Sequence, residues 1–493
     1  MASGDTKTEA LMNILENGGS IEGISGSGNT KFQDYIVDNI LSIDSAKDAI
    51  ASKGGTVGDT GLAGLADEIA SIPSGGGSDA SDEVRFIDYD GTIIKQMSAQ
   101  EATALTELPT GPTHDGLTFD GWTHTLAQVK EGHMIDVGAL YVSSNNADET
   151  VFEVQPTAGQ QISFNFIQDT ANGVSVDWGD GSTPDTYADV GTSIAASHTY
   201  SATPKSSLYI RVLPSSGANI TTITSPSVMC TSVIIGRAPI FGATSALKVV
   251  VTKKCTSTAF IMGSTSAKCV IIPNTFTSLG TNAFSSARSL TTVVLPETIT
   301  TISSRAINQC YLLERLVLPK SIYSIAVGSS GSLAQVYGIK TMYYGCELQP
   351  PSDPSRGSFL YQCYGLSNFI IDKKLDSLIL PSSFFLYTYS LHSITIPEGV
   401  IELSNVFLGQ TNFMREIIFE DRATMPTMHT DTFKYHVNPL ILDFTKCKQV
   451  PTFNAGWSGA NVDGIIIKVP ASLETSWKAA NGWSEYAANI VGV

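Results

Sequence analysis

Three segments repeat in register: AKCVIIPNTFTSLGTNAFSSAR (267–288), LTTVVLPETITTISSRAINQCY (290–311) and LERLVLPKSIYSIAVGSSGSLA (313–334). In each segment an apolar run is closed by a proline, and the prolines follow one another at a spacing of 23 residues: Pro273, Pro296 and Pro319. Self-similarity at a short, constant period is typical of solenoids, in which each repeat buries its apolar face only against its neighbours. The larger half of the chain is therefore predicted to be a solenoid.

Composition narrows the class of protein. The chain has 493 residues, which favours roughly three domains. Its net charge of -17 disfavours a nucleic-acid partner, because a phosphate backbone attracts a basic surface. No apolar run approaches the ~20 residues that a membrane-spanning helix needs, so no membrane insertion is expected.

The seven cysteines form no metal-binding spacing and all lie in the predicted solenoid: Cys230, Cys255, Cys269, Cys310, Cys346, Cys363 and Cys447. Their number is odd and several fall at core-facing repeat positions. We therefore expect free buried thiols in place of disulfides or zinc ligands.

The N-terminal part is predicted to anchor the protein. Residues 1–72 contain three short apolar helical patterns separated by glycines, too small to form a monomeric core. They indicate an oligomerisation or docking segment, with a partly disordered leader as the alternative. Residues 73–82 (PSGGGSDASD) have the composition of a flexible linker. The first residues lack the basic and apolar regions of a secretory signal.

Residues 83–149 are predicted to form a small β module. Alternation over 84–87 and the turn at Asp90-Gly91 indicate a hairpin. The later Phe119-Asp120-Gly121-Trp122 resembles the closing motif of the β-grasp repeats found in bacterial surface proteins, which implies a β-grasp-like fold for this module.

Residues 150–215 alternate in short strands and predict a β-sandwich. Asp177-Trp178-Gly179-Asp180-Gly181 with His198-Thr199-Tyr200 resembles the polycystic-kidney-disease type of immunoglobulin-like domain. Both motifs then have a turn-and-packing role, which disfavours His198 as a catalytic base. Two carboxylates, Asp177 and Asp180, are too few to predict a calcium site.

Residues 216–493 form the predicted solenoid with a C-terminal cap. Strands are expected at 233–235, 249–251, 270–272, 293–295, 316–318, 339–341, 369–371, 394–396, 417–419, 440–442 and 465–469. The repeat resembles the surface type of leucine-rich repeat, since Leu290, Val293, Leu295, Pro296, Ile299, Ile302, Ala306 and Cys310 fit it position by position. In the closing segment, Trp477 and Trp483 are predicted to seal the open end of the array.

Two surfaces break the repeat pattern and are candidate contacts. One strand row is largely β-branched where a water-facing sheet is usually polar: Ile271, Val294, Val317, Ile370 and Ile418. Another subunit or domain covering this face and simple strand propensity explain it equally well. The second surface is rich in tyrosine around an insertion, and its candidate receptor contacts are Tyr343, Tyr344, Tyr361, Tyr364, Tyr387 and Tyr389. Packing of these tyrosines on their own scaffold is the alternative.

The predicted fold class is thus multidomain and mainly β, with a small helical N-terminal anchor, a β-grasp-like module, an immunoglobulin-like β-sandwich and a C-terminal leucine-rich-repeat solenoid. No catalytic motif, cofactor site or metal-ligand spacing stands out, so no enzyme is predicted. The modules resemble extracellular adhesion domains, yet no secretory signal precedes them.

That combination resembles tail-fibre, receptor-binding or head-fibre proteins of bacteriophages, which are assembled in the host cytoplasm and exposed after lysis. The resemblance implies a virion protein, a homotrimer, that docks on other virion proteins through 1–72. Its solenoid would bind a host cell-surface glycan or protein. The alternatives are a bacterial cell-surface adhesin and a glycan depolymerase.

Overall fold

The chain divides into two compact units, residues 1–80 and 81–493. The computed structural model describes 83–493 apart from 132, 240–244, 256, 264, 323, 326–332, 347–359, 373–376, 381–383, 386–387, 404–413, 430–431, 434–439 and 453–463. The predicted anchor (1–72) and linker (73–82) lie outside the described residues. Within the described residues, no helix is long and apolar enough to cross a membrane.

Residues 83–149, called the module from here on, form one mixed sheet with two short helices. Its strands are β1 (Glu83–Ile87), β2 (Ile93–Ser98), β3 (Leu117–Trp122) and β4 (Ile135–Ser143), in the order β2-β1-β4-β3. The predicted hairpin at Asp90-Gly91 is confirmed, because β1 and β2 pair antiparallel, while β1 and β4 run parallel. Helices α4 (Ala99–Thr103) and α5 (Leu126–Val129) each begin with a capping box. The likeness to a β-grasp repeat stays a prediction.

Residues 150–251 form two sheets. One contains β5 (Thr150–Val154), β7 (Val174–Asp177), β8 (Asp185–Thr186), β10 (Leu208–Pro214), β12 (Ser232–Ile235) and β13 (Lys248–Val251); the other contains β6 (Gln161–Gln168), β9 (Ile194–Thr199) and β11 (Ile220–Ile223). Because β11 pairs with β6, the two-sheet part extends beyond the predicted limit at residue 215. β12 pairs with both β5 and β13, so this part continues directly into the solenoid. The immunoglobulin-like assignment stays a prediction.

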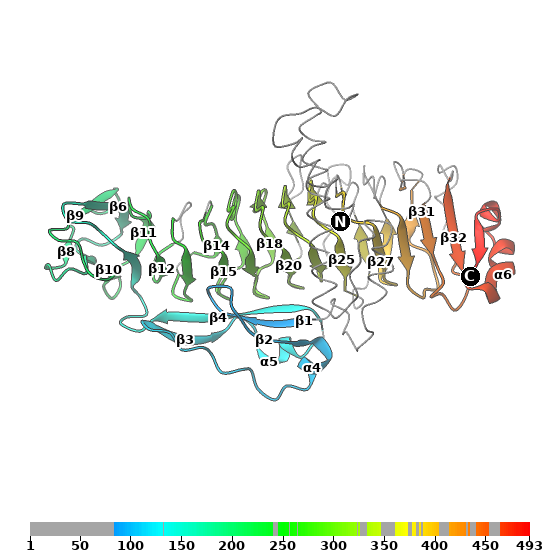
Figure 1. Cartoon of the computed structure of the whole chain (residues 1–493), viewed down its shortest axis with the longest axis horizontal. Helices are drawn as coiled ribbons and strands as arrows, with labels where there is room; N and C mark the ends of the chain where they lie inside the picture. Colours follow the sequence, from blue (N-terminus) through cyan, green and yellow to red (C-terminus); the bar gives the residue numbers. More distant parts are fainter. Residues whose placement is uncertain are drawn as a thin grey trace, which may run out of the picture. The chain divides into compact units, whose positions relative to one another are not determined.

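The solenoid is built on a main ladder of strands, one per turn, which pair in parallel within three successive groups. After β13 come β15 (Cys269–Ile271), β17 (Thr292–Val294), β20 (Arg315–Leu318), β23 (Thr341–Tyr344), β25 (Asn368–Ile371), β27 (Ser393–Ile396), β29 (Glu416–Phe419), β31 (Leu440–Asp443), β32 (Ile465–Val469) and β33 (Ile490–Gly492). Figure 1 shows these strands side by side from green to red. The predicted strands match this ladder closely, apart from 339–341.

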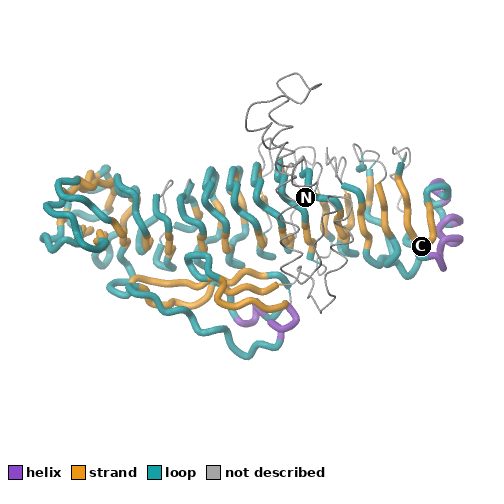
Figure 2. The backbone as a smooth tube through the Cα atoms, viewed as in Figure 1, coloured by secondary structure: helices purple, strands orange, loops and turns teal. Residues whose placement is uncertain are grey.

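Shorter parallel ladders run along the other sides of the turns. One contains β14 (Ala259–Phe260), β16 (Ser278–Leu279), β18 (Thr301–Ile302) and β21 (Ser324–Ile325), and another β19 (Ile307–Asn308), β22 (Leu333–Ala334) and β24 (Leu360–Tyr361). A third contains β26 (Leu378–Leu380), β28 (Val400–Leu403) and β30 (Thr427–Met428). The second isoleucine of the repeat, such as Ile302, lies in these ladders. Turns that carry these short strands are thus hydrogen-bonded to their neighbours on more than one side, and Figure 2 shows short strands away from the main ladder.

One apolar core runs through the two-sheet part, the solenoid and the cap, from Phe152 to Ile490. All seven cysteines are buried and free, as predicted from their number and positions. Burial raises the pKa of the Cys230 and Cys310 thiols to about 12. These cysteines act as small apolar core residues.

The solenoid ends in a cap made of η2 (Ala471–Leu473), α6 (Glu474–Ala479), η3 (Ser484–Tyr486) and β33. Trp477 and Trp483 are both fully buried, with ring centroids 4.5 Å apart, and the ring of Trp477 lies 5.0 Å from that of Phe444, which directly follows β31. The prediction that these tryptophans seal the end of the array is confirmed.

Replacing Trp477 with alanine is expected to cost about 3–5 kcal/mol, because it removes a fully buried aromatic ring and leaves a cavity at the end of the core. Urea unfolding and limited proteolysis of the full chain measure the loss, with cleavage expected first in the last turns. Val491→Ala in the same cap, at a side chain that is 45% exposed, is the matched control. Equal stability of the two variants would contradict the sealing role.

Candidate functional site on the face and edge of the solenoid

The outer face of the main ladder is formed by side chains that point away from the solenoid core. Its paired rows are Cys269, Thr292, Arg315, Thr341, Asn368, Ser393, Glu416 and Ile271, Val294, Val317, Tyr343, Ile370, Thr395, Ile418. The predicted strand at 339–341 is wrong: β23 begins at Thr341, so Tyr343 takes the place expected for Lys340. The turn from Arg315 to Thr341 is longer than 23 residues, and counting at constant period therefore lost the register there.

The module covers the first part of this face. Ile271 and Val294 are buried in one cluster with Ile87 and Leu140 of the module. The remaining members of the predicted row are Val317, Ile370 and Ile418, and all three are partly exposed. Figure 2 shows the module's sheet alongside the turns of the solenoid. What covers the apolar row at β15 and β17 is thus another part of the same chain.

A buried carboxylate joins the module to the solenoid. Asp136 of β4 is only 4% exposed, and Arg85 donates to both of its oxygens at 2.8 Å. Arg315 of β20 donates to Asp136 Oδ1 at 3.1 Å and lies 3.4 Å from Glu83. Although burial opposes it, the charges and hydrogen bonds of Arg315 and Arg85 lower the pKa of Asp136. The ion pairs thus tie β20 to two strands of the module.

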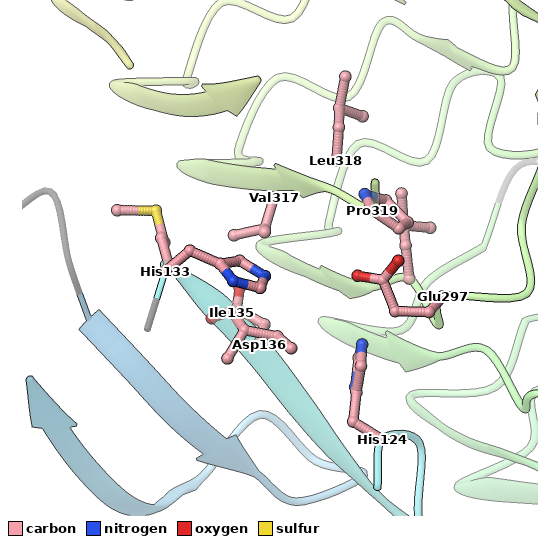
Figure 3. Close-up of a pocket in the computed structure, with 10 residues that line it drawn as sticks. His124, His133, Ile135, Asp136, Glu297, Val317, Leu318 and Pro319 are labelled. Carbon is pink, nitrogen blue, oxygen red and sulfur yellow. The ribbon is translucent and has the colours of Figure 1, made fainter. Parts of the chain in front are cut away.

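A cavity of about 10 Å³, room for roughly one water molecule, lies beside this carboxylate. Figure 3 shows His124 and His133 of the module around it, with Glu297 and Pro319 of the solenoid opposite. Burial raises the pKa of Glu297. The ring of His133 stacks on Tyr343 at 6.1 Å. This cluster could not be predicted from the sequence, because its members are far apart along the chain and share no motif.

His124 is held in its neutral form. Thr123 Oγ1 accepts the Gly138 N–H at 2.8 Å and shares a hydrogen bond of 2.9 Å with His124 Nδ1. The imidazole is 4% exposed, and burial lowers the pKa of His124 to about 4. Protonation of this histidine therefore opposes the folded state.

Stability is expected to fall as the pH drops from 6.5 to 4. In that window the unfolded chain binds a proton at His124 and the folded chain does not, which removes about 3 kcal/mol of folding free energy. His124→Gln keeps an acceptor for Thr123 without titrating, and it should flatten this part of the profile. Urea unfolding at several pH values measures it, with His392→Gln at an exposed histidine as control. An unchanged slope in His124→Gln would contradict the assignment.

Two candidate receptor tyrosines are wrong, because they are buried. Tyr344 is an inward-facing residue of β23 and packs in the core at 5.7 Å from the ring of Phe369. Tyr343 faces outward but is 3% exposed, since it lies beneath His133. Tyr387 lies outside the described residues, as does the side chain of Tyr361. Tyr364 and Tyr389 are partly exposed and belong to a larger arrangement.

Four tyrosines, one from each of four successive turns, form a stacked row that we call the tyrosine ladder: Tyr311, Tyr337, Tyr364 and Tyr389. Neighbouring ring centroids are 5.0, 5.0 and 5.1 Å apart, and the ring planes deviate by at most 8°. Arg288 of the preceding turn lies over Tyr311 at 5.6 Å. The faces of the inner rings are thus covered by their neighbours, while Tyr337 is 36% exposed and the others are partly exposed.

A second row, the glutamine ladder, lies two residues earlier in each turn: Gln309, Gln335 and Gln362. The amide of Gln309 donates to Gln335 at 3.1 Å, and that of Gln335 donates to Gln362 at 3.0 Å. All three glutamines have φ of 57°, a left-handed conformation at which the backbone turns the corner. A methyl group on Gly338 or Gly365, which follow Tyr337 and Tyr364, would strike the carbonyl oxygen of the tyrosine in the previous turn. These glycines therefore allow the close approach that stacks the rings.

The Asp177 and Asp180 carboxylates of the two-sheet part hold turns. Asp177 accepts the Gly179 N–H at 2.9 Å, and Asp180 lies 2.7 Å from His198 Nε2. Burial opposes ionisation, yet hydrogen bonds from Ser182 and His198 lower the pKa of Asp180 to about 2. His198 stacks on the buried Trp178. Across the part of the chain that the structure describes, no group of three or more His, Cys, Asp or Glu residues is placed to hold a metal ion.

Comparison with known proteins bears on the solenoid. Residues 239–334 and 354–439 match the model of the BspA type leucine rich repeat region, in six copies. The search of curated proteins gave no match.

Three solved structures are similar at low identity. A leucine-rich repeat protein from Bacteroides ovatus ATCC 8483 is 12% identical over 52% of this chain and 81% of its own, with a TM-score of 0.25. The pneumococcal vaccine antigen PcpA is 12% identical over 53% of this chain and 77% of its own, with a TM-score of 0.25. A leucine rich cell surface protein from Faecalibacterium prausnitzii A2-165 is 14% identical over 50% and 94%, with a TM-score of 0.19. The predicted leucine-rich repeat is confirmed by the family match, and this chain carries BspA-type leucine-rich repeats over 239–334 and 354–439.

Proposed function

We propose that this chain is an attachment protein, without catalytic activity, whose solenoid binds a glycan or protein on a cell surface. The observation that carries the proposal is the periodic surface beyond the module. From β25 to β29 the outer face presents Asn368, Ile370, Ser393, Thr395, Glu416 and Ile418, all partly or fully exposed. A periodic surface of this kind, with a polar row beside a β-branched one, suits contact with an extended partner.

The proposed carrier is a bacteriophage virion, with residues 1–72 docking on other virion proteins and bringing three copies together. The order of the parts along the chain supports this carrier. A bacterial cell-surface adhesin is the second candidate, because a leucine-rich-repeat solenoid offers the same extended contact surface on either carrier.

Binding of the fluorescently labelled full chain to intact bacteria tests the proposal. Saturable binding that unlabelled chain competes away is expected for at least one bacterial species related to the source of the gene. Ile418→Asp on the exposed part of the outer face should weaken it, whereas Val190→Asp, at a side chain 45% exposed in the two-sheet part, should leave it unchanged. Absence of saturable binding would overturn the attachment role.

The carrier is decided by where the protein is found. Mass spectrometry of purified phage particles and of washed cell envelopes should detect the chain in the particles, with a solution mass of three chains. Detection in envelopes alone would replace the virion by the cell-surface adhesin. Release of reducing sugars from host envelopes by the purified chain would instead establish a depolymerase.

A further inference from the structure

The tyrosine ladder has a spacing that matches one class of ligand. It presents one phenol per turn over four turns, at intervals of 5.0, 5.0 and 5.1 Å along the solenoid axis. In an extended polysaccharide with equatorial (1→4) links, each sugar ring advances the chain by nearly the length of one ring, which is close to this interval. A peptide strand advances by only ~3.3 Å per residue and would fall out of step within two rings.

The chemistry exposed along the ladder also suits a sugar chain. Because each inner ring is sandwiched between its neighbours, a ligand meets ring edges and hydroxyl groups in place of ring faces. A hydroxyl both donates and accepts a hydrogen bond, as does each hydroxyl of a sugar. The glutamine ladder, two residues earlier in each turn, adds amide groups at the same period. The edge therefore carries two parallel rows, one of phenols and one of amides, at the same period.

The net charge of the chain also bears on which polysaccharides could bind the ladder. The net charge of -17 repels polyanions, which disfavours acidic polysaccharides.

We propose that the tyrosine ladder binds a neutral, extended, equatorially (1→4)-linked polysaccharide that lies parallel to the solenoid axis, with about one sugar opposite each tyrosine. This inference rests on the proposed attachment function and adds to the outer face a second contact, the tyrosine ladder, with a named class of ligand. The four rings set the length of the site at about four sugars. Each contact is weak, so affinity depends on how many rings the chain spans.

Titration of the full chain with cello- and chito-oligosaccharides of two to six units, followed by calorimetry, tests the proposal. Affinity should rise with length up to about four units and then level off. The double variant Tyr337→Phe/Tyr364→Phe keeps the stacked rings and removes two hydroxyls, and affinity should fall roughly tenfold for two lost hydrogen bonds. Tyr209→Phe, at a 45% exposed tyrosine in the two-sheet part, is the matched control. Malto-oligosaccharides, whose axial links curve the chain, should bind at least tenfold more weakly.

Several results would overturn the inference: no binding of either extended series, affinity independent of length, equal binding of malto-oligosaccharides, or a double variant that binds as well as the parent. A dimer that the double variant abolishes, without sugar binding, would assign the ladder to contact between copies of the chain. The parent chain and the double variant Tyr337→Phe/Tyr364→Phe, measured also in the cell-binding assay, separate the sugar-binding proposal from the attachment proposal. Cell binding that survives without oligosaccharide binding removes only this inference, and the reverse removes only the attachment role.

Discussion

Replacing Gly138 with valine is expected to lift the module off the outer face of the solenoid. Gly138 lies in β4 directly over Ile271, and a methyl group at Gly138 would overlap Ile271 Cγ2 and lie 3.1 Å from its Cδ1 and Cγ1. Ile271 is β-branched, buried and unable to rotate away, so the contact has no room to relax. Overpacking of this kind costs about 1–3 kcal/mol, and here it acts on the interface between the module and the solenoid.

Cys269 reports the result, because its thiol is buried at this same contact. It lies in one cluster with Ile87 and Leu140 of the module, beside the carbonyl oxygen of Asp88. Release of the module should expose this thiol and accelerate its labelling by a fluorescent maleimide in native buffer. The labelled peptide, identified by mass spectrometry, should contain Cys269 and none of the other six cysteines.

A compensating substitution makes the test specific. Ile271→Ala alone leaves a cavity beneath Gly138, and combined with Gly138→Ala it restores contact, so the double variant should label more slowly than Gly138→Ala alone. Ala139→Val is the control, because it adds bulk to β4 at the position next to Gly138. Gly116→Ala would not serve as a control, since Gly116 has a φ of 75° and any side chain there adds backbone strain. Labelling of Gly138→Val at the rate of the parent chain would show that the module does not depend on this contact.

The repeat period predicted the main ladder well because every strand ends on a similar apolar pattern. All the expected strands overlap observed ones, but the one at 339–341 shares only Thr341 with β23. There the turn gains residues between Arg315 and Thr341, and an inserted residue is invisible to a count at constant period. Strand propensity could have located β23 correctly, because tyrosine at 343 and 344 favours a strand more than lysine at 340 does.

The sequence of β4 indicates that this strand is covered on both faces, which the repeat period of the solenoid alone does not show. β4 reads IDVGALYVS and is buried along nearly its whole length, as expected of a strand with both faces covered. A glycine within such a run indicates close approach of another backbone or side chain. The partner, Ile271, lies more than a hundred residues away, and no local rule pairs two such positions.

The sequence shows that this region is rich in tyrosine, but it does not show which tyrosines stack into the ladder. The sequence shows a concentration of tyrosines after residue 335, and only alignment of Gln309-Cys310-Tyr311, Gln335-Val336-Tyr337 and Gln362-Cys363-Tyr364 separates the stacked ones. Burial then removes Tyr343 and Tyr344, whose positions in the strand pattern place them on either side of β23. Which tyrosines face water depends on the register of the repeat, and the predicted register was shifted at β23.

Replacing Asp136 with alanine is expected to cost about 3–5 kcal/mol, because it leaves Arg85 and Arg315 facing each other at a mostly buried site without their shared anion. Arg315→Met should cost less, since Arg85 still holds both oxygens of Asp136. The triple variant Arg85→Met/Asp136→Leu/Arg315→Met removes all three charges and should recover much of the lost stability. Urea unfolding at pH 7 measures the three differences.

The pH profile separates this carboxylate from His124. The pKa of Asp136 is lowered in the folded chain, so its contribution is fully present above the usual carboxylate value near 3.8 and is lost as the pH falls below it. The loss from His124 falls between pH 6.5 and 4, in a window that does not overlap. The triple variant should therefore lose the share of Asp136 in the acid limb below about pH 4. It should keep the His124 limb, shifted to lower pH, because the Asp136 charge no longer raises the pKa of His124. A triple variant whose stability has the same pH profile as that of the parent chain would contradict the role of Asp136. Rapid maleimide labelling of Cys269 in the triple variant would show that the ion pairs, more than the apolar contact, hold the module in place.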